Sequence, residues 1–170
     1  MFHYRLPPLL YPFLDNKELV ALSGMNRELE QETYTLRKKR KEVVAANALS
    51  SFYVEHFKLI SVHRMSDSRR LIRRFFTFLP ELGVFLTEKG VTGLDLSPPL
   101  SEYFTAEECR EILGKLYAIV RENRTLTYCN LRGFEQYITW KDSAALLSNH
   151  PTLSMQHPIA TPFCFYQRRI

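Results

Sequence analysis

One spacing of apolar residues constrains the fold of this chain more than any other feature. Apolar side chains follow the pattern L-x-x-L-x-L, where L is any apolar residue, at 57–62, 91–96 and 126–131, so the copies lie 34 and 35 residues apart. Alternate side chains of a strand face the same side, so the last two apolar positions of each copy point into a core together. The pattern predicts three similar strands with inward residues Phe57, Ile60 and Val62, then Val91, Leu94 and Leu96, then Leu126, Cys129 and Leu131.

The segments between these strands carry apolar residues at helical spacing. Thr105 with Glu108 three residues later forms a capping box, which predicts that a helix begins there. A helix is also predicted over 68–86, ended or kinked by Pro80. A shorter helix over 142–148 is expected to pack Ala144, Ala145, Leu146 and Leu147 inward.

A fourth copy of the pattern begins at Leu153, 27 residues after Leu126, and is degenerate. Gln156 and Pro158 occupy its second and third apolar positions. Copies of a strand and a helix stack as a solenoid, because each copy buries its apolar face only against its neighbours. The alternative is an ordinary α/β domain whose strands look alike by chance.

The helix-to-strand junctions add a family resemblance. The phrases N-R-T-L at 123–126 and N-H-P-T-L at 149–153 each lead into a strand, and L-D-L-S and C-N-L-R follow at 94–97 and 129–132. Together they resemble leucine-rich repeats of the ribonuclease-inhibitor type over about residues 55–160. The resemblance implies an α/β fold, a short solenoid with parallel strands and outer helices. The period exceeds the 20–29 residues usual for the family, which implies an insertion at 97–104, and the Asn that normally turns the chain after the strand is missing.

The N-terminal segment has a different character. Asp15 can cap a helix in which Glu18 takes the third position, and Leu19, Leu22 and Met25 then fall on one face. This stretch resembles the second half of an F-box. The first half departs from the family pattern, because its Leu-Pro lies at 6–7, four residues late, a proline at 12 interrupts the first helix, and a leucine at 29 replaces the tryptophan.

The F-box resemblance implies an adaptor whose helices, within 1–45, dock on a Skp-type linker of a cullin–RING ubiquitin ligase, while the repeats in 46–170 hold a target. The alternative is a helical cap that seals one end of the solenoid and contributes the same side chains to the core. The residues concerned are Leu9, Leu10, Phe13, Leu14, Leu19, Leu22 and Met25.

Composition limits the class of protein. Hydrophobic residues make up 45% and charged residues 24% of the 170, with a net charge of +5, which is typical of a globular chain. Its three cysteines, Cys109, Cys129 and Cys164, form no CxxC pair and favour reduced thiols. We find no signal peptide and no apolar run near the roughly 20 residues that span a bilayer. These features predict a cytoplasmic protein, or one in a host cytosol if the chain is a secreted effector.

No catalytic motif is recognisable in the sequence. There is no GxSxG, no glycine-rich phosphate loop and no paired-carboxylate spacing, so the chain is expected to be non-enzymatic and without a cofactor. His56 and His63 lie seven residues apart, as do His150 and His157, with a cysteine seven further on. This spacing is not that of a zinc site, and no metal is expected.

Two basic groups stand out. The run at 37–41 is five consecutive cations on a helix expected over 28–48, suited to nuclear import, although a solvated helix face is the more ordinary interpretation. Arg69, Arg70, Arg73 and Arg74 form one face of the next helix. They could meet an acidic partner or simply face solvent. Nucleic acid is not an expected partner, and the free chain is expected to be a monomer.

The residues that alternate with the inward leucines predict a partner-binding face. Tyr and Arg are favoured interface anchors, so Tyr128 and Arg132 are the leading candidates, with Tyr137 and Trp140 in the following loop as an extension or a core cap. Two functions remain open, namely an adaptor, which could be a microbial mimic, and a module that binds or inhibits a partner directly. The predicted face comprises Leu59, Ser61, His63, Gly93, Asp95, Ser97, Tyr128, Asn130 and Arg132.

Overall fold

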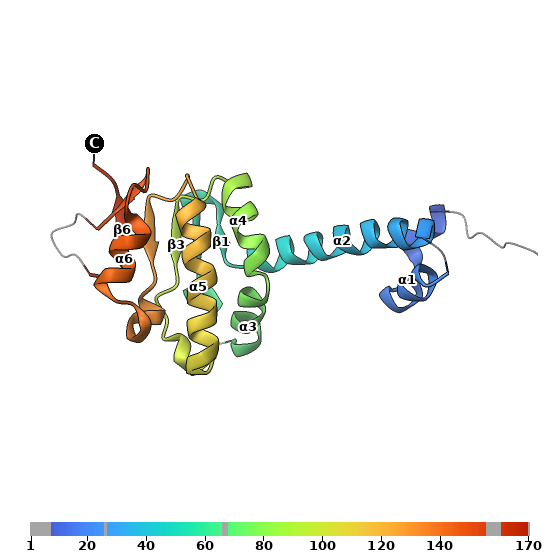
Figure 1. The fold of residues 1–170 in the computed structure, drawn as a ribbon, viewed down its shortest axis with the longest axis horizontal. Coiled ribbons are helices and arrows are strands. Elements are labelled where there is room, and N and C mark those ends of the chain that lie inside the picture. Colours follow the sequence, from blue (N-terminus) through green and yellow to red (C-terminus); the bar gives the residue numbers. More distant parts are fainter. Residues whose placement is uncertain (1–7, 26, 66–67, 156–160, 170) are drawn as a thin grey trace, which may run out of the picture. The chain divides into compact units, whose positions relative to one another are not determined.

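The chain forms two compact units, Met1–Ala45 and Ala46–Ile170. The computed structural model describes residues 8–25, 27–65, 68–155 and 161–169, and Figure 1 shows its ribbon. The first unit is helical, and the second combines helices with a sheet.

Three helical segments form the first unit. A 3-10 helix, η1 (Pro8–Phe13), precedes α1 (Asn16–Ser23), and α2 (Arg27–Ser50) runs on into the second unit. The predicted capping box begins α1, since the Glu18 N–H donates to the Asp15 carboxylate at 2.8 Å and the Asp15 N–H donates to the Glu18 carboxylate at 2.7 Å. A small core is formed by Tyr11, Leu19 and Leu29, with Leu14, Leu22 and Leu36 packed against it.

One cation of the basic run holds this unit together. The Arg40 guanidinium donates to the carbonyls of Tyr11, at 3.3 Å, and Pro12, at 3.0 Å, and to the Asn16 side chain at 3.2 Å. It therefore ties η1 and α1 to α2. The helix predicted over 28–48 is confirmed as α2, but its basic run is not a uniformly solvated face.

The second unit is mixed α/β, built on one open sheet. The strands are β1 (Tyr53–Val54), β2 (Leu59–Ser61), β3 (Gly93–Asp95), β4 (Tyr128–Asn130), β5 (Leu153–Ser154) and β6 (Cys164–Gln167). Their order is β1-β2-β3-β4-β6-β5. The three central strands β2, β3 and β4 are parallel, and the remaining neighbours pair antiparallel.

The three parallel strands are the three predicted copies, and they pair in the predicted register. Ile60 lies beside Leu94 and Leu94 beside Cys129, which reproduces the spacings of 34 and 35 residues. Of the nine predicted inward residues, eight are fully buried. Phe57 is the exception and is exposed, because it ends the 3-10 turn η2 (Glu55–Phe57) in the hairpin between β1 and β2. Lys58, at φ 50°, then turns the chain into β2.

Each parallel strand is followed by a 3-10 segment and then by helix. Those segments are η3 (Val62–Met65), η4 (Leu100–Glu102) and η5 (Arg132–Tyr137), and the helices are α3 (Arg69–Thr77), α4 (Leu79–Glu88), α5 (Ala106–Glu122) and α6 (Trp140–Leu147). Figure 1 shows these helices together on one side of the sheet. They cover the face of the sheet that carries the fully buried residues.

The helix boundaries follow local signals. Thr105 and Glu108 form the predicted capping box of α5. The helix predicted over 68–86 breaks at Phe78, with Pro80 in the first turn of α4, as expected for proline.

The last helix differs from the prediction at its start and on its buried side. Thr139 caps α6 through the Asp142 N–H, so the helix begins before residue 142. Its buried stripe is therefore Ser143, Leu146 and Leu147, at helical spacing. The prediction that Ala144 and Ala145 pack inward was wrong, since both are exposed.

The fourth copy does not continue the parallel series. Leu153 is fully buried in β5, but β6 lies between β4 and β5 and runs antiparallel to both. The side chain of Phe165 fills the core position beside Cys129 that a fourth parallel copy would have occupied. Gln156 and Pro158 lie outside the described residues.

Two buried polar side chains shape the junctions into β4 and β5. The Asn123 side-chain oxygen accepts from the N–H groups of Thr125 and Leu126, both at 2.8 Å. The Nδ1 of His150 accepts from the Leu153 N–H at 3.0 Å, and its Nε2 donates to the Val120 carbonyl at 2.8 Å. His150 therefore performs the structural task of Asn123, one repeat later.

Candidate functional site

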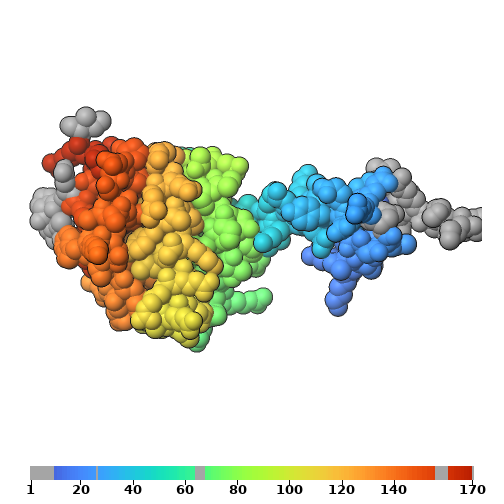
Figure 2. Space-filling view, viewed as in Figure 1, coloured from blue at the N-terminus to red at the C-terminus, as the bar shows by residue number. Residues whose placement is uncertain are grey.

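The face of the sheet opposite the helices is the candidate site. Helical side chains cover the strands on the side shown in Figure 2. On the opposite face, strand pairing and the alternation of side chains define two rows. The first row is Val54, Leu59, Gly93, Tyr128, Tyr166 and Ser154, and the second is Ser61, Asp95, Asn130 and Cys164.

The predicted face residues are brought together in the expected order. Leu59, Asp95, Tyr128 and Asn130 are half-buried, whereas Ser61 is buried. A β-carbon on Gly93 would come within 2.7 Å of the Leu59 Cδ1, so the leucine side chain lies across the glycine and closes that part of the surface.

The residues just beyond the strands also meet. The His63 ring nitrogen Nε2 is hydrogen-bonded to the Ser97 hydroxyl, which joins the first copy to the second. Arg132 is exposed and forms an ion pair with Glu135, with 3.8 Å between Nε and the carboxylate oxygen. This edge of the face is therefore polar and internally paired.

Tyr128 lies in a cluster of aromatic and polar groups. Its ring centroid is 5.8 Å from that of Tyr166, with the two planes tilted by 56°. The Asn130 amide donates to the Tyr128 hydroxyl at 3.3 Å. Burial raises the pKa of Tyr128, the hydrogen bond from Asn130 lowers it, and the negative charge of Asp95 raises it further. The net shift is upward, so this phenol is neutral near pH 7.

The carboxylate and the amide of the second row hold the turns that follow their strands. The Asp95 oxygen accepts from the Ser97 N–H at 3.1 Å, and the Asn130 oxygen accepts from the Arg132 N–H at 2.9 Å. Both are Asx turns at equivalent positions of neighbouring strands. An aspartate and an asparagine thus do the same structural work, but only the aspartate adds charge.

Sequence reasoning missed four residues of this face, namely Val54, Ser154, Cys164 and Tyr166. Tyr166 and Cys164 lie beside Tyr128 and Asn130, because β6 pairs with β4. The only sequence signal for Cys164 and Tyr166 was the strand propensity of the aromatic residues over 163–166.

The two residues suggested as an extension of the face belong to the helical side instead. The Tyr137 ring lies 5.3 Å from the Arg110 guanidinium of α5. Trp140 is 54% exposed and is the first residue of α6, not a loop residue. Neither extends the sheet face.

The predicted linker-docking residues of the first unit divide into two groups. Leu19 is fully buried, and Leu14 and Leu22 are partly buried against the core, so these three hold the unit together. Leu10, Phe13 and Met25 are exposed, Phe13 at 83% and Met25 at 67%. The side chain of Leu9 lies outside the described part of the structure.

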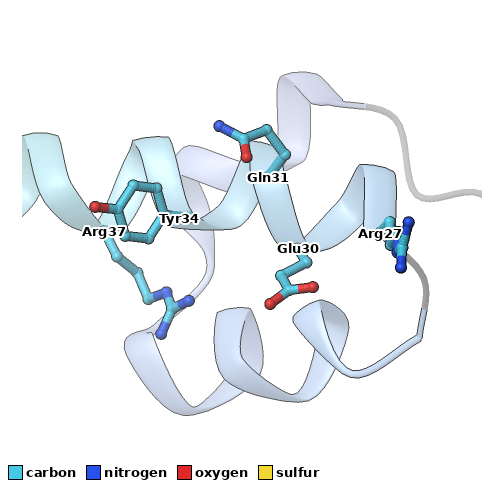
Figure 3. Close-up of a pocket in the computed structure, with 5 residues that line it drawn as sticks. All are labelled: Arg27, Glu30, Gln31, Tyr34 and Arg37. Carbon is cyan, nitrogen blue, oxygen red and sulfur yellow. The ribbon is translucent and has the colours of Figure 1, made fainter.

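A hollow of about 420 Å³ also lies along α2 in the first unit, lined by Arg27, Glu30, Gln31, Tyr34 and Arg37. In Figure 3 the Gln31 amide points away from the Glu30 carboxylate, and the Arg27 and Arg37 side chains lie at opposite ends of the group. A ligand site needs polar groups that converge. These groups diverge, so the hollow does not form a built site.

The predicted basic face on α3 is partly engaged. The Arg73 guanidinium donates to the Tyr103 carbonyl at 2.6 Å, lies 3.5 Å from the Glu108 carboxylate and stacks 5.0 Å from the Phe104 ring. Arg69, Arg70 and Arg74 are exposed. Arg73 therefore belongs to the packing between α3 and the start of α5.

Neither a metal site nor a membrane-spanning helix is found among the residues that the structure describes. Among them, no group of three or more histidine, cysteine or acidic side chains is arranged to hold a metal ion. Within the same ranges, none of the helices combines the length and apolar character needed to cross a bilayer. His157 lies outside those ranges.

Comparison with known proteins identifies no similar protein. No family model, curated protein or solved structure matches the chain.

Proposed function

We propose that the chain is a non-enzymatic protein-binding adaptor and that its target binds the face of the sheet opposite helices α3 to α6. The observation that carries the proposal is the in-register alignment of half-exposed side chains from three parallel strands, opposite a helix-covered core. Tandem strand-and-helix units present partner surfaces in this way. The finer description of this unit as a short leucine-rich-repeat solenoid is part of the proposal.

The first unit supplies the second half of the adaptor. Phe13 and Met25 expose large apolar side chains, and such side chains on a small unit are suited to burial by a partner. We assign Leu10, Phe13 and Met25 to contact with a Skp-type linker. Leu14, Leu19 and Leu22 then support that surface from within.

A second candidate is favoured by the same unit. Three of the predicted docking residues form or line the core, as expected if these helices mainly stabilise the chain. In that case the sheet face binds or inhibits a partner directly, without ubiquitin machinery.

Binding of a purified Skp-type linker to the full chain separates the two candidates. The adaptor predicts that Phe13→Asp and Met25→Asp each weaken binding, while Val84→Asp does not, because Val84 is comparably exposed, at 59%, on α4 of the other unit. If the wild-type chain does not bind the linker, the adaptor is refuted and the direct binder stands.

The sheet face is tested on the target side. Tyr128→Ala and Arg132→Glu should each reduce affinity for a partner isolated with the wild-type chain, by about tenfold or more if they are interface anchors. Lys115→Glu on α5 is the matched charge reversal on the helical side. Unchanged affinity in both face variants would exclude this face as the binding surface.

A further inference from the structure

One charged side chain on the face of the sheet opposite the helices has no counterion among the residues that the structure describes. The acidic and basic residues of the face are His63, Asp95 and Arg132; His63 is hydrogen-bonded to Ser97, and Arg132 is paired with Glu135. The Asp95 carboxylate accepts one backbone N–H from Ser97 and forms no ion pair with any residue that the structure describes. Asp95 is also half-exposed, so a partner can reach it.

Aromatic rings stand next to this carboxylate. Asp95 pairs with Asn130 across β3 and β4, and Tyr128 occupies the adjoining row with Tyr166 beside it. Tyr128 is half-buried, its hydroxyl accepts from the Asn130 amide, and its ring centroid lies 5.8 Å from that of Tyr166. The carboxylate and the two rings therefore lie on one face of the sheet, with Tyr128 between Asp95 and Tyr166 in strand order.

Elsewhere in the same chain, a guanidinium already lies between an aromatic ring and a carboxylate. On the helical side, the Arg73 guanidinium lies 5.0 Å from the Phe104 ring and 3.5 Å from the Glu108 carboxylate. A guanidinium between a ring and a carboxylate gains cation–π attraction and a charge-assisted hydrogen bond together. On the sheet face the carboxylate and the rings are present, and Asp95 has no ion pair with a residue that the structure describes.

We propose that Asp95, Tyr128 and Tyr166 form a recognition site for an arginine side chain of the partner protein. This inference rests on the proposed function, since it names the group by which a target would be held on the sheet face. Arginine fits better than lysine, because its planar guanidinium stacks on a ring while its edge donates to a carboxylate. The ammonium of lysine is a compact, strongly hydrated charge that meets one of these requirements at a time.

The substitution that tests the site preserves the fold. Asn130 makes the same turn from the equivalent position of β4 that Asp95 makes from β3. Asp95→Asn therefore keeps the hydrogen bond to the Ser97 N–H and removes only the charge. Glu111→Gln, on the exposed side of α5, is the matched control for losing a carboxylate.

The experiment titrates N-acetyl-arginine amide into the ¹⁵N-labelled full chain and follows backbone amide shifts. The expected result is saturable binding in the millimolar range, with shifts concentrated at Asp95, Tyr128 and Tyr166. Asp95→Asn should weaken the binding of this probe about fivefold, the size of one ion-pair contribution, since the stacking on the rings is kept, and Glu111→Gln should leave the binding unchanged. N-acetyl-lysine amide should bind more weakly, and the uncharged N-acetyl-citrulline amide should not saturate.

Each contrary result is informative. Shifts that do not saturate, that spread over the whole surface or that persist unchanged in Asp95→Asn overturn the arginine site. If a protein partner loses affinity with Tyr128→Ala but not with Asp95→Asn, the proposed function stands and the arginine site falls. If the amino-acid probe binds as expected but no partner requires the face, the proposed function falls and the site remains.

Discussion

Gly133 lies where the third repeat packs against the loop that follows β3, and this contact leaves no room for a side chain. A β-carbon there would lie 2.4 Å from the Pro98 carbonyl oxygen, 2.5 Å from the Leu96 carbonyl oxygen and 3.0 Å from Leu100 Cγ. The Gly133 N–H also donates to the Leu96 carbonyl at 2.8 Å. Gly133→Ala therefore forces two backbone segments apart and strains a hydrogen bond between neighbouring repeats.

The expected cost follows from these contacts. Overpacking against rigid groups costs about 1–3 kcal/mol and a lost backbone hydrogen bond about 1 kcal/mol, together about 2–4 kcal/mol. Domain stabilities are about 5–15 kcal/mol, so the loss would be large. With a urea dependence of about 2 kcal/mol per molar, the unfolding midpoint should fall by about 1–2 M.

Urea unfolding followed by the fluorescence of Trp140 measures this effect in the correct unit, since Trp140 is the single tryptophan and lies on α6. Gly114→Ala is the matched control, because a β-carbon at this position of α5 would meet no neighbouring group within 4 Å, and it should stabilise by up to about 1 kcal/mol. Gly93→Ala should cost less than Gly133→Ala, since only the flexible end of Leu59 is in the way. A Gly133→Ala midpoint within about 0.3 M of the wild type, at the same urea dependence, would refute the reasoning.

Three further predictions concern buried polar groups. Tyr117→Phe should be neutral or stabilising at pH 7, because the buried hydroxyl has no hydrogen-bond partner among the residues that the structure describes. Burial and then the charge of Asp142 raise the pKa of Tyr117 from 10 to about 12. The stability linked to this shift is fully present below pH 10 and is lost as the pH rises from 10 to 12, so the variant should lose less stability than the wild type over that window in urea titrations. His150→Ala should destabilise the chain by about 2–4 kcal/mol, because two backbone N–H groups and a carbonyl lose their hydrogen-bond partner. His150→Asn should recover part of that loss, because its side-chain oxygen can accept hydrogen bonds as that of Asn123 does. Equal unfolding midpoints for the two variants would contradict this reasoning. A thiol reagent should modify Cys164 rapidly in the native chain, and Cys109 and Cys129 only after unfolding. The reason is that Cys109 and Cys129 are fully buried and that burial raises the pKa of both thiols. Rapid modification of all three cysteines would exclude the described packing.

The parallel strands were predictable because their signal is local and repeated. Each copy buries alternate residues, so Ile60, Leu94 and Cys129 identify both the strand and its register. The prediction that Phe57 points inward was wrong because the same spacing can arise when a short turn precedes a strand. The backbone conformation of Lys58 decides between the two, and lysine carries no sequence signal for it.

The C-terminal part was not predictable from spacing. β6 pairs with β4 across more than thirty residues, and such a pairing depends on which partner strand is free, not on local pattern. As a result Tyr166, half of the aromatic pair, was missed. The first unit shows the complementary limit, since amphipathic spacing placed Leu19 and Met25 on one face but could not show that only Leu19 is covered.

The position of β6 sets a rule for how this architecture can be lengthened. A tandem array normally grows by duplication at either end, because each new unit meets the same edge that its predecessor left. Here β6 runs against the parallel strands and occupies the edge of β4, so a unit added after α6 would have to displace it. Growth is therefore confined to the interior, and a copy of about 35 residues inserted between α5 and β4 would widen the binding face while leaving both terminal strands intact.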